Sequence, residues 1–254
     1  MLEAVLRRQG WIIALCLAGL ATLAWRYTLQ IGARMTADMG PMASLGAHRM
    51  VLGPDEVAIT FAMWAVMMVA MMLPAATPAV LLHATAARQR QDRWALAGTG
   101  LFVLGYLAAW TLFSVGATGV QWFLHDLALL TGAMAIESRR IAGLVLIGAG
   151  LYQWSPLKYA CLRHCQSPLG FFFGHWRNGP AGTVRMGFEH GLYCVGCCWL
   201  LMLILFLVGV MNMAWVAAIA IYVLAEKVLP IGRRLAQASG GVAIGVGAVL
   251  LAGI

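Results

Sequence analysis

The stretch VAITFAMWAVMMVAMMLPAATPAVLLH, residues 57–83, decides the fold class of this chain. It contains no Asp, Glu, Lys or Arg, and it exceeds the ~20 apolar residues that a helix needs to cross a bilayer. Pro74 and Pro78 lie inside it and are expected to kink or end the helix. The stretch therefore predicts a transmembrane helix.

The composition of the whole chain extends this prediction. Hydrophobic residues make up 62% of the 254 residues and charged residues only 10%, against roughly 25% charged in a soluble protein. The formal net charge is +8, but the basic residues lie between apolar runs rather than along one face. This distribution is typical of loops that set membrane topology, and it argues against nucleic acid as a partner.

The apolar runs predict an all-α, polytopic transmembrane helix bundle of about seven spans in one integral membrane domain, residues 1–254. The first run begins like a signal peptide, but the further spans favour an uncleaved transmembrane helix. The last run is rich in Gly and Ala, which permits close helix contact. Besides residues 57–83, the expected spans are residues 11–25, 95–120, 141–154, 186–210, 213–229 and 235–254.

The connectors between these spans predict the orientation. A cytoplasmic N-terminus places 12 of the 17 Lys and Arg residues inside, which fits the positive-inside rule. The chain is therefore expected in a cytoplasmic membrane, with residues 26–56 as a polar outer loop that carries Met35, Met39, Met42 and Met50. Residues 155–189 contain three prolines and several glycines, and they predict an irregular connector on the cytoplasmic side.

Five of the six cysteines gather in two groups that predict a metal site. Cys194, Cys197 and Cys198 share one helical face with His190, and Cys161 and Cys165 are also one turn apart. Thiolates select Cu(I), Zn(II) or iron–sulfur clusters. The sixth cysteine, Cys16, is expected to be a small apolar residue in the helix core.

Two other roles are open for the cysteines. A membrane thiol–disulfide oxidoreductase would use Cys194 and Cys197 as an exchanging pair, with Cys161 and Cys165 as a relay. The chain could also be a structural subunit of a larger membrane complex. A stable disulfide is not expected, because a cytoplasmic site stays reduced. Walker, HExxH and GxSxG motifs are absent, so an enzymatic role is less favoured than metal binding.

The methionines of residues 63–72 form a second constellation of soft sulfur. Thioethers bind Cu(I) without burying anionic charge, although methionine also fills irregular gaps between helices. A passage from the outer loop to the inner cysteines is therefore geometrically possible. The methionines concerned are Met63, Met67, Met68, Met71 and Met72.

Ionisable residues at membrane depth are costly, and this makes Glu226 a candidate functional group. It is a possible metal ligand, a partner of His190 or a member of an ion pair. Its neighbour Lys227 is expected to extend to the interface. His164 and His175 are expected to be solvated loop residues.

Several of these segments together resemble a known family. They are residues 64–74, 158–170, 187–199, 209–213 and 226–227, of which the string Tyr193-Cys-Val-Gly-Cys-Cys-Trp199 is the most specific. The chain resembles bacterial predicted metal-binding integral membrane proteins over about residues 62–232. The resemblance implies a membrane protein that holds metal, and it implies no particular substrate or reaction.

These observations predict a membrane protein that handles a soft transition metal, most plausibly Cu(I), with Zn(II) as the other option. Its task would be transport, storage or delivery to a membrane metalloenzyme or metallochaperone. Cys194, Cys197 and Cys198 would be the first ligands, with Cys161 and Cys165 completing the site.

Overall fold

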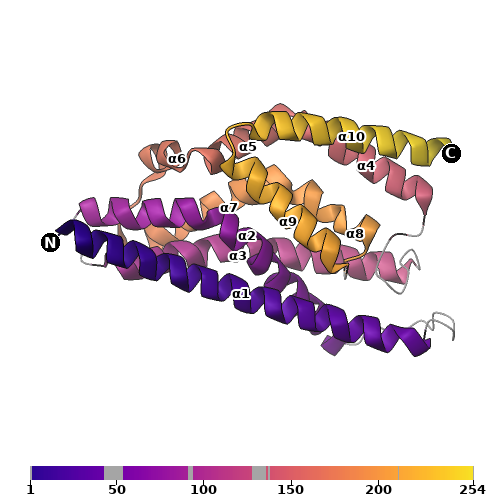
Figure 1. Ribbon diagram of the computed structural model, residues 1–254, viewed down its shortest axis with the longest axis horizontal. Helices are drawn as coiled ribbons and strands as arrows, with labels where there is room; N and C mark the ends of the chain where they lie inside the picture. The colour runs from indigo at the N-terminus through magenta and orange to yellow at the C-terminus, as the bar shows by residue number, and fades with distance from the viewer. Residues whose placement is uncertain are drawn as a thin grey trace.

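The computed structural model describes residues 2–42, 54–90, 94–127, 136, 138–210 and 212–253. The predicted all-α class is confirmed for these residues (Figure 1). The helices are α1 (Leu2–Met42), α2 (Pro54–Gln89), α3 (Ala95–Asp126), α4 (Arg139–Gln153), α5 (Pro156–Gln166), α6 (Pro168–His175), α7 (Gly179–Leu203), α8 (Leu205–Val208), α9 (Met213–Val228) and α10 (Gly232–Ala252).

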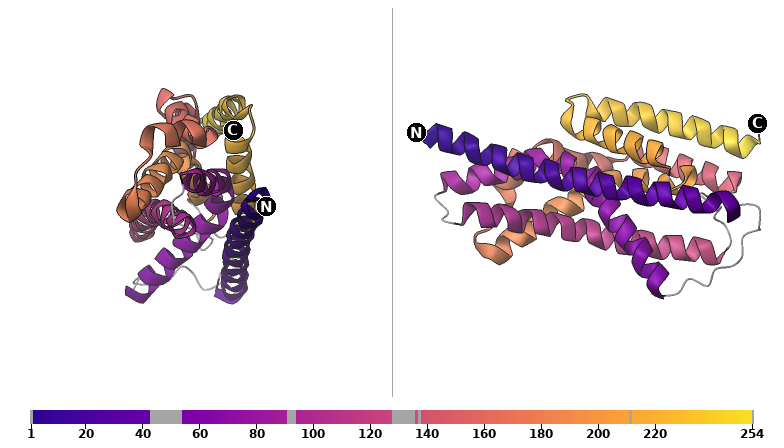
Figure 2. Two further views of the ribbon diagram at one scale, coloured as in Figure 1. Left: turned by 90° about the vertical axis from the view of Figure 1, so that its left-hand side faces the viewer. Right: turned by 60° about the horizontal axis from the view of Figure 1, so that its bottom comes forward.

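The long helices run along the long axis of the molecule, with the two chain ends at opposite ends of that axis (Figure 1). Helix α7 packs against α3, and α2 packs against both α1 and α3. Helices α4 and α10 lie side by side along one edge (Figures 1 and 2). The short helices α5 and α6 lie beside the middle and one end of this bundle.

Five helical segments are long and apolar enough to cross a membrane, which supports a multi-pass membrane protein. They are Gly10–Ala33, Asp55–Gln89, Ala95–Asp126, Gly179–Val208 and Gly232–Ala252. The other two predicted spans correspond to α4 and α9, which have 15 and 16 residues. Helix α4 ends before the Ser155-Pro156 pair, and α9 ends just before Pro230, because proline disfavours a helical residue before it.

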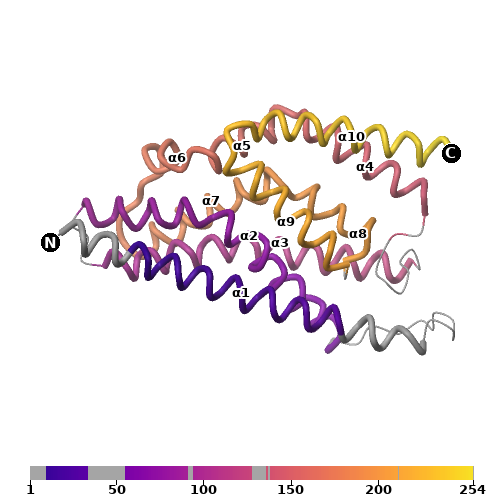
Figure 3. The backbone as a smooth tube through the Cα atoms, in the orientation of Figure 1, coloured from indigo at the N-terminus to yellow at the C-terminus, as the bar shows by residue number. Residues whose placement is uncertain are grey.

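The prediction that residues 26–56 form a loop is wrong for its first part, because α1 continues to Met42. Met35, Met39 and Met42 therefore belong to a helix, whereas Met50 lies outside the described residues. Helix α2 continues through Pro74 and Pro78 to Gln89. It changes direction along its length, as its trace shows (Figures 2 and 3), so the prolines bend this helix without ending it.

The predicted irregular connector at residues 155–189 is also wrong. Its prolines stand in the first turns of α5, α6 and α7, where the missing N–H needs no partner. The Ser155 hydroxyl caps α5 by accepting a hydrogen bond from the Lys158 backbone N–H at 3.1 Å. Cys161 and Cys165 are thus held on a regular helix.

Glycines allow two helix pairs to approach closely. A Cβ atom on Gly187 of α7 would overlap the Phe102 carbonyl of α3, and one on Gly105 would overlap the Val184 carbonyl. In α10, a Cβ on Gly240 would lie 2.9 Å from the Gly150 carbonyl oxygen of α4. The close contact predicted for the Gly- and Ala-rich last helix is confirmed.

Substituting Gly187 with Ala should destabilise the protein, because the added methyl group forces α3 and α7 apart. Overpacking of this kind costs about 1–3 kcal/mol. The control is Gly100→Ala in α3, where a Cβ meets no atom within 4 Å and alanine favours the helix. Thermal unfolding in detergent should show a lower Tm for G187A and an unchanged or higher Tm for G100A. Equal Tm values would contradict the close packing of α3 and α7.

Candidate metal centre

The predicted thiol face of α7 lies in the protein core. His190, Cys194, Cys197 and Cys198 are each at most 3% exposed, and they follow the three- and four-residue spacing of one helix face. The Cys197 and Cys198 thiols donate to the Cys194 carbonyl at 3.1 and 3.0 Å. These two cysteines are therefore satisfied as neutral thiols when no ion is bound.

Helix α5 brings the second thiol group to this face. The Sγ atoms of Cys165 and Cys197 are 4.0 Å apart. Cys161 lies against Gly196, where the Sγ atom would be 2.8 Å from an added Cβ, so only glycine leaves room for it. If one ion bonded to both Cys165 and Cys197 with metal–sulfur distances of ~2.3 Å, the S–metal–S angle would be about 120°. The pair can therefore bind an ion in trigonal geometry.

Cys194 contacts polar side chains from two other helices. Lys227 Nζ of α9 donates to Cys194 Sγ at 2.8 Å and lies 4.0 Å from Cys198 Sγ. The Tyr106 hydroxyl of α3 lies 3.0 Å from Cys194 Sγ and donates to the Met72 carbonyl of α2 at 3.1 Å. Cys194 thus stands where α2, α3, α7 and α9 meet.

Lys227 does not extend to an interface as predicted, because it is only 5% exposed and is directed at sulfur. A buried ammonium is stable only beside a negative charge. The nearest atom able to carry that charge is Cys194 Sγ. A thiolate at Cys194 would therefore be the counter-ion of a Lys227 ammonium.

Glu226 forms a buried ion pair. Its carboxylate lies 2.6 Å from Lys158 Nζ of α5, and both side chains are fully buried. Lys158 also donates to Gln153 of α4, and Gln153 donates to Ser239 of α10 at 3.0 Å. This polar network holds α4, α5, α9 and α10 together.

His190 is buried and does not pair with Glu226. Its Nδ1 atom has no hydrogen-bond partner among the described residues, and its ring packs edge-on against Phe171 with centroids 5.0 Å apart. Glu226 is paired with Lys158 instead. The imidazole therefore keeps an unused nitrogen close to the thiol face.

The predicted methionines pack around the cysteines in one core cluster. Met63, Met67, Met68, Met71 and Met72 are each at most 4% exposed, and they share this cluster with Cys194, Cys197 and Cys198. The sequence analysis missed a further member, Met202, which is fully buried in the same cluster. Thioether and thiol sulfur thus occupy one continuous region of the core.

The structure does not bring every sulfur atom to this centre. Cys16 is exposed on α1, so the expectation that it lies in the core is wrong. The prediction that His164 and His175 are solvated loop residues is also wrong, because both are half-buried on helices α5 and α6. Within the described ranges, no group of three or more His, Cys, Asp or Glu side chains is arranged to hold a metal ion.

Two groups on α5 have shifted pKa values. Burial raises the pKa of the Cys161 thiol, and the nearby Cys197 raises it further. Burial lowers the pKa of His164, with smaller contributions from His175 and Arg163. Both shifts favour the neutral side chains in the metal-free protein.

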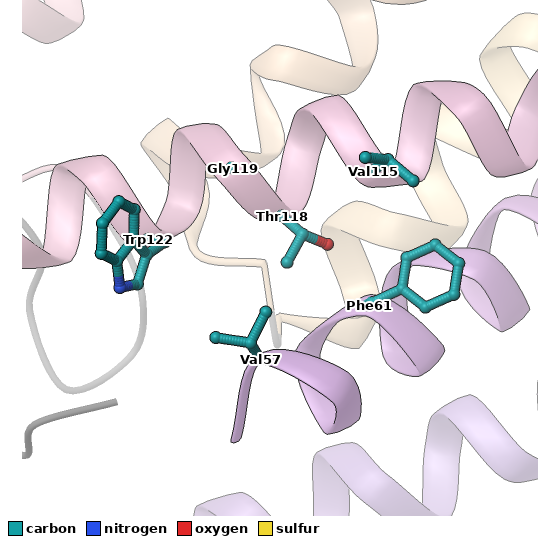
Figure 4. A pocket seen from close by; sticks show the side chains of 6 residues that line it. All are labelled: Val57, Phe61, Val115, Thr118, Gly119 and Trp122. Carbon is teal, nitrogen blue, oxygen red and sulfur yellow. The ribbon is translucent and has the colours of Figure 1, made fainter. Parts of the chain in front are cut away.

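A pocket between α2 and α3 is unsuited to metal (Figure 4). It has a volume of about 490 Å³ and carries no thiol, imidazole or carboxylate. Its single hydroxyl, on Thr118, donates to the Ser114 carbonyl at 2.8 Å. Its lining residues are Val57, Phe61, Val115, Thr118, Gly119 and Trp122.

The sequence analysis gave no role in the centre to three residues that shape it, namely Tyr106, Lys158 and Lys227. A lysine within or beside an apolar helix is a usable signal, since burial requires an anionic partner. The partner itself could not be named, because Lys158 and Glu226 are far apart in sequence, as are Lys227 and Cys194.

A family model described as PpoB2, a copper chaperone, matches residues 61–250. The chain belongs to the PpoB2 copper chaperone family. The matched residues include most of α2 and all of α3, α5, α7 and α9, and hence every thiol and thioether of the buried cluster. No curated protein and no solved structure matches the chain.

Membership of the PpoB2 family establishes the class of function, which is copper handling associated with a membrane. It agrees with the resemblance to metal-binding integral membrane proteins noted over about residues 62–232. Copper is therefore the metal that membership of the family implies for this chain.

Replacing either Lys158 or Glu226 alone by methionine should strongly destabilise this PpoB2 protein, because one charge is left buried and unpaired. Such a loss costs about 3–5 kcal/mol, whereas replacing both partners by apolar groups is often neutral. Thermal unfolding in detergent should therefore rank K158M and E226M well below the double variant. A double variant no more stable than the single variants would contradict the pairing.

Proposed function

We propose that this protein binds copper as Cu(I) between α5 and α7 and passes it on within the membrane. Cys194, Cys197 and Cys198 supply the sulfur ligands from α7, while Cys161 and Cys165 complete the site or relay the ion, and two of these cysteines bind the ion as thiolates at a time. His190, buried on the same helix, is a nitrogen donor in reserve. Glu226 holds Lys158 in this arrangement and does not bind the ion.

One observation carries the proposal, namely the 4.0 Å approach of Cys165 and Cys197 from two separate helices. Two isolated cysteines on one helix would be ordinary packing. A thiol pair contributed by two helices, inside a chain of a copper chaperone family, supports a shared ion.

The buried charges suit a Cu(I) ion held by two thiolates. Such a site carries a single negative charge, which the ammonium of Lys227 balances when the remaining cysteines, Cys194 among them, are neutral thiols. Without copper, a Cys194 thiolate balances the same ammonium.

The methionine cluster supports a route for the ion. Methionine recurs every four residues along α2 at Met63, Met67 and Met71, with Met68 and Met72 beside them. The Tyr106 hydroxyl contacts both the Met72 carbonyl and Cys194 Sγ, and so links this helix to the thiols. Neutral thioethers can pass Cu(I) along this helix without holding it as tightly as thiolates.

The proposed setting is a bacterial cytoplasmic membrane, with the N-terminus inside and α4 and α9 counted as the two shorter spans. The chain ends at opposite ends of the long axis support an odd number of crossings (Figure 1). A membrane metalloenzyme or a metallochaperone is the proposed recipient of the copper. Storage would use the same copper–sulfur bonds without transfer to a recipient.

Elemental analysis of the detergent-purified protein tests the thiol site. We expect stoichiometric copper in the wild-type protein. The affinity for copper should fall at least tenfold in Cys197→Ser and in Cys165→Ser, because each substitution removes one of the two thiolates that bind the ion. The matched control, Cys16→Ser, should keep its copper, since Cys16 lies on the exposed face of α1.

Two results would contradict the proposal. Metal-free protein with a reversible disulfide would favour a thiol–disulfide oxidoreductase. Metal-free protein that co-purifies with other subunits would favour a structural role.

Volume-conserving substitutions test the methionine route. Replacing Met63, Met67 and Met71 by leucine removes the thioethers with little loss of packing, so copper delivery in cells should fall severalfold while the purified protein keeps its Tm. Met186→Leu is the control, because Met186 is fully buried in a different core cluster. Unchanged cellular copper in the triple variant would exclude the route.

A further inference from the structure

Two histidines outside the thiol cluster face one another across α5 and α6. The ring centroids of His164 and His175 are 6.0 Å apart, and the ring planes cross at 86°, so neither ring covers the other face to face. Both side chains are half-buried. The pair therefore combines a fixed position with access from solvent.

Neighbouring aromatic rings hold both imidazoles in place. His164 stacks on Tyr193 of α7 with centroids 4.1 Å apart, and His175 stacks on Phe171 at 4.7 Å. The four rings lie within 6.3 Å of one another in every pairing. Such packing removes most of the rotational freedom that metal binding would otherwise have to restrict.

The hydrogen bond of His175 leaves one nitrogen free. Its Nδ1 atom lies 3.1 Å from the Phe171 carbonyl oxygen, which can only accept, so Nδ1 carries the proton. In the neutral ring, Nε2 then presents a lone pair. Histidines that bind metals are usually oriented in this way, by donating the other ring N–H to a carbonyl or carboxylate.

The separation of the two rings fits a shared ion. An ion bonded at ~2.0–2.1 Å to one nitrogen of each ring would lie roughly 3.2 Å from each centroid, so rings up to about 6.4 Å apart can share it. The observed 6.0 Å lies within this limit. Imidazole nitrogen suits copper in proteins.

The pair is also adjacent to the thiol centre along two helices. His164 directly precedes Cys165, and Tyr193, on which His164 stacks, directly precedes Cys194. The thiols of Cys194 and Cys197 are buried, whereas the two histidines are half-exposed. An ion moving between solvent and the thiols would therefore meet the imidazoles at the rim.

We propose that His164 and His175 form a second copper site, at which Cu(I) enters or leaves the thiol centre. The role of this site as an entry or exit point rests on the proposed function, whereas copper binding at the site requires only the two imidazole rings. In the exchange, copper–nitrogen bonds break as copper–sulfur bonds form, each neutral thiol that binds releases its proton to water or to the imidazole that copper leaves, and copper keeps its oxidation state. Two protein ligands leave positions open for a donor from the molecule that brings or takes the ion.

Copper-edge X-ray absorption tests this site on the full chain in detergent, loaded anaerobically with excess Cu(I). We expect both sulfur and nitrogen neighbours in the wild type. The double variant H164Q/H175Q should lose the nitrogen neighbours and one copper equivalent while it keeps sulfur-bound copper, which also shows that it has folded. The control His125→Gln, an exposed residue of the last turn of α3, should match the wild type.

The outcomes separate this inference from the thiol site. Nitrogen neighbours that persist in C165S/C197S support the histidine site, even if sulfur-bound copper is missing throughout and the thiol proposal fails. Wild-type protein without nitrogen neighbours overturns the histidine site. So does a nitrogen signal that survives in H164Q/H175Q and disappears only in His190→Gln.

Discussion

The ion pair between Lys158 and Glu226 is the constraint on which the arrangement of thiols depends. Helix α5 has only 11 residues, too few to span a membrane or to position itself by length. Its buried lysine must meet a negative charge, and Glu226 of α9 supplies that charge, which places α5 against α9. That placement turns Cys161 and Cys165 toward α7.

The same requirement applies on the other side of the thiols. Lys227 follows Glu226 directly, so the residue that anchors α5 and the residue that contacts Cys194 stand next to each other on α9. Charge balance thereby links the position of the helices to the protonation of the thiol centre. A Cu(I) ion bound by two thiolates preserves this balance between positive and negative charge. The balance explains why charged groups are tolerated so deep in an apolar protein.

The sequence predicted most of the fold from local patterns. Residues 57–83 and 95–120 became α2 and α3 because long apolar runs have few alternatives in a membrane. The common face of Cys194, Cys197 and Cys198 followed from helical periodicity alone. The expected irregularity at residues 155–189 failed because the prolines there were interpreted as helix breakers, whereas each stands in the first turn of a helix.

The pairings across helices could not be predicted in this way. The contacts of Lys158 with Glu226 and of Lys227 with Cys194 join residues that periodicity does not connect. The extension of α1 to Met42 was missed because charged residues suggested a loop. His164 and His175 were underestimated for a similar reason, since nothing local shows that Tyr193 and Phe171 would pack on them.

The central claim is that thiols from α5 and α7 share one copper ion. A crystal of the copper-loaded protein, with an anomalous difference map recorded at the copper edge, tests it directly. The account predicts a peak within bonding distance of Cys165 Sγ and Cys197 Sγ. A peak bonded to neither sulfur atom, or continuous density joining two cysteines as a disulfide with no copper present, would contradict it.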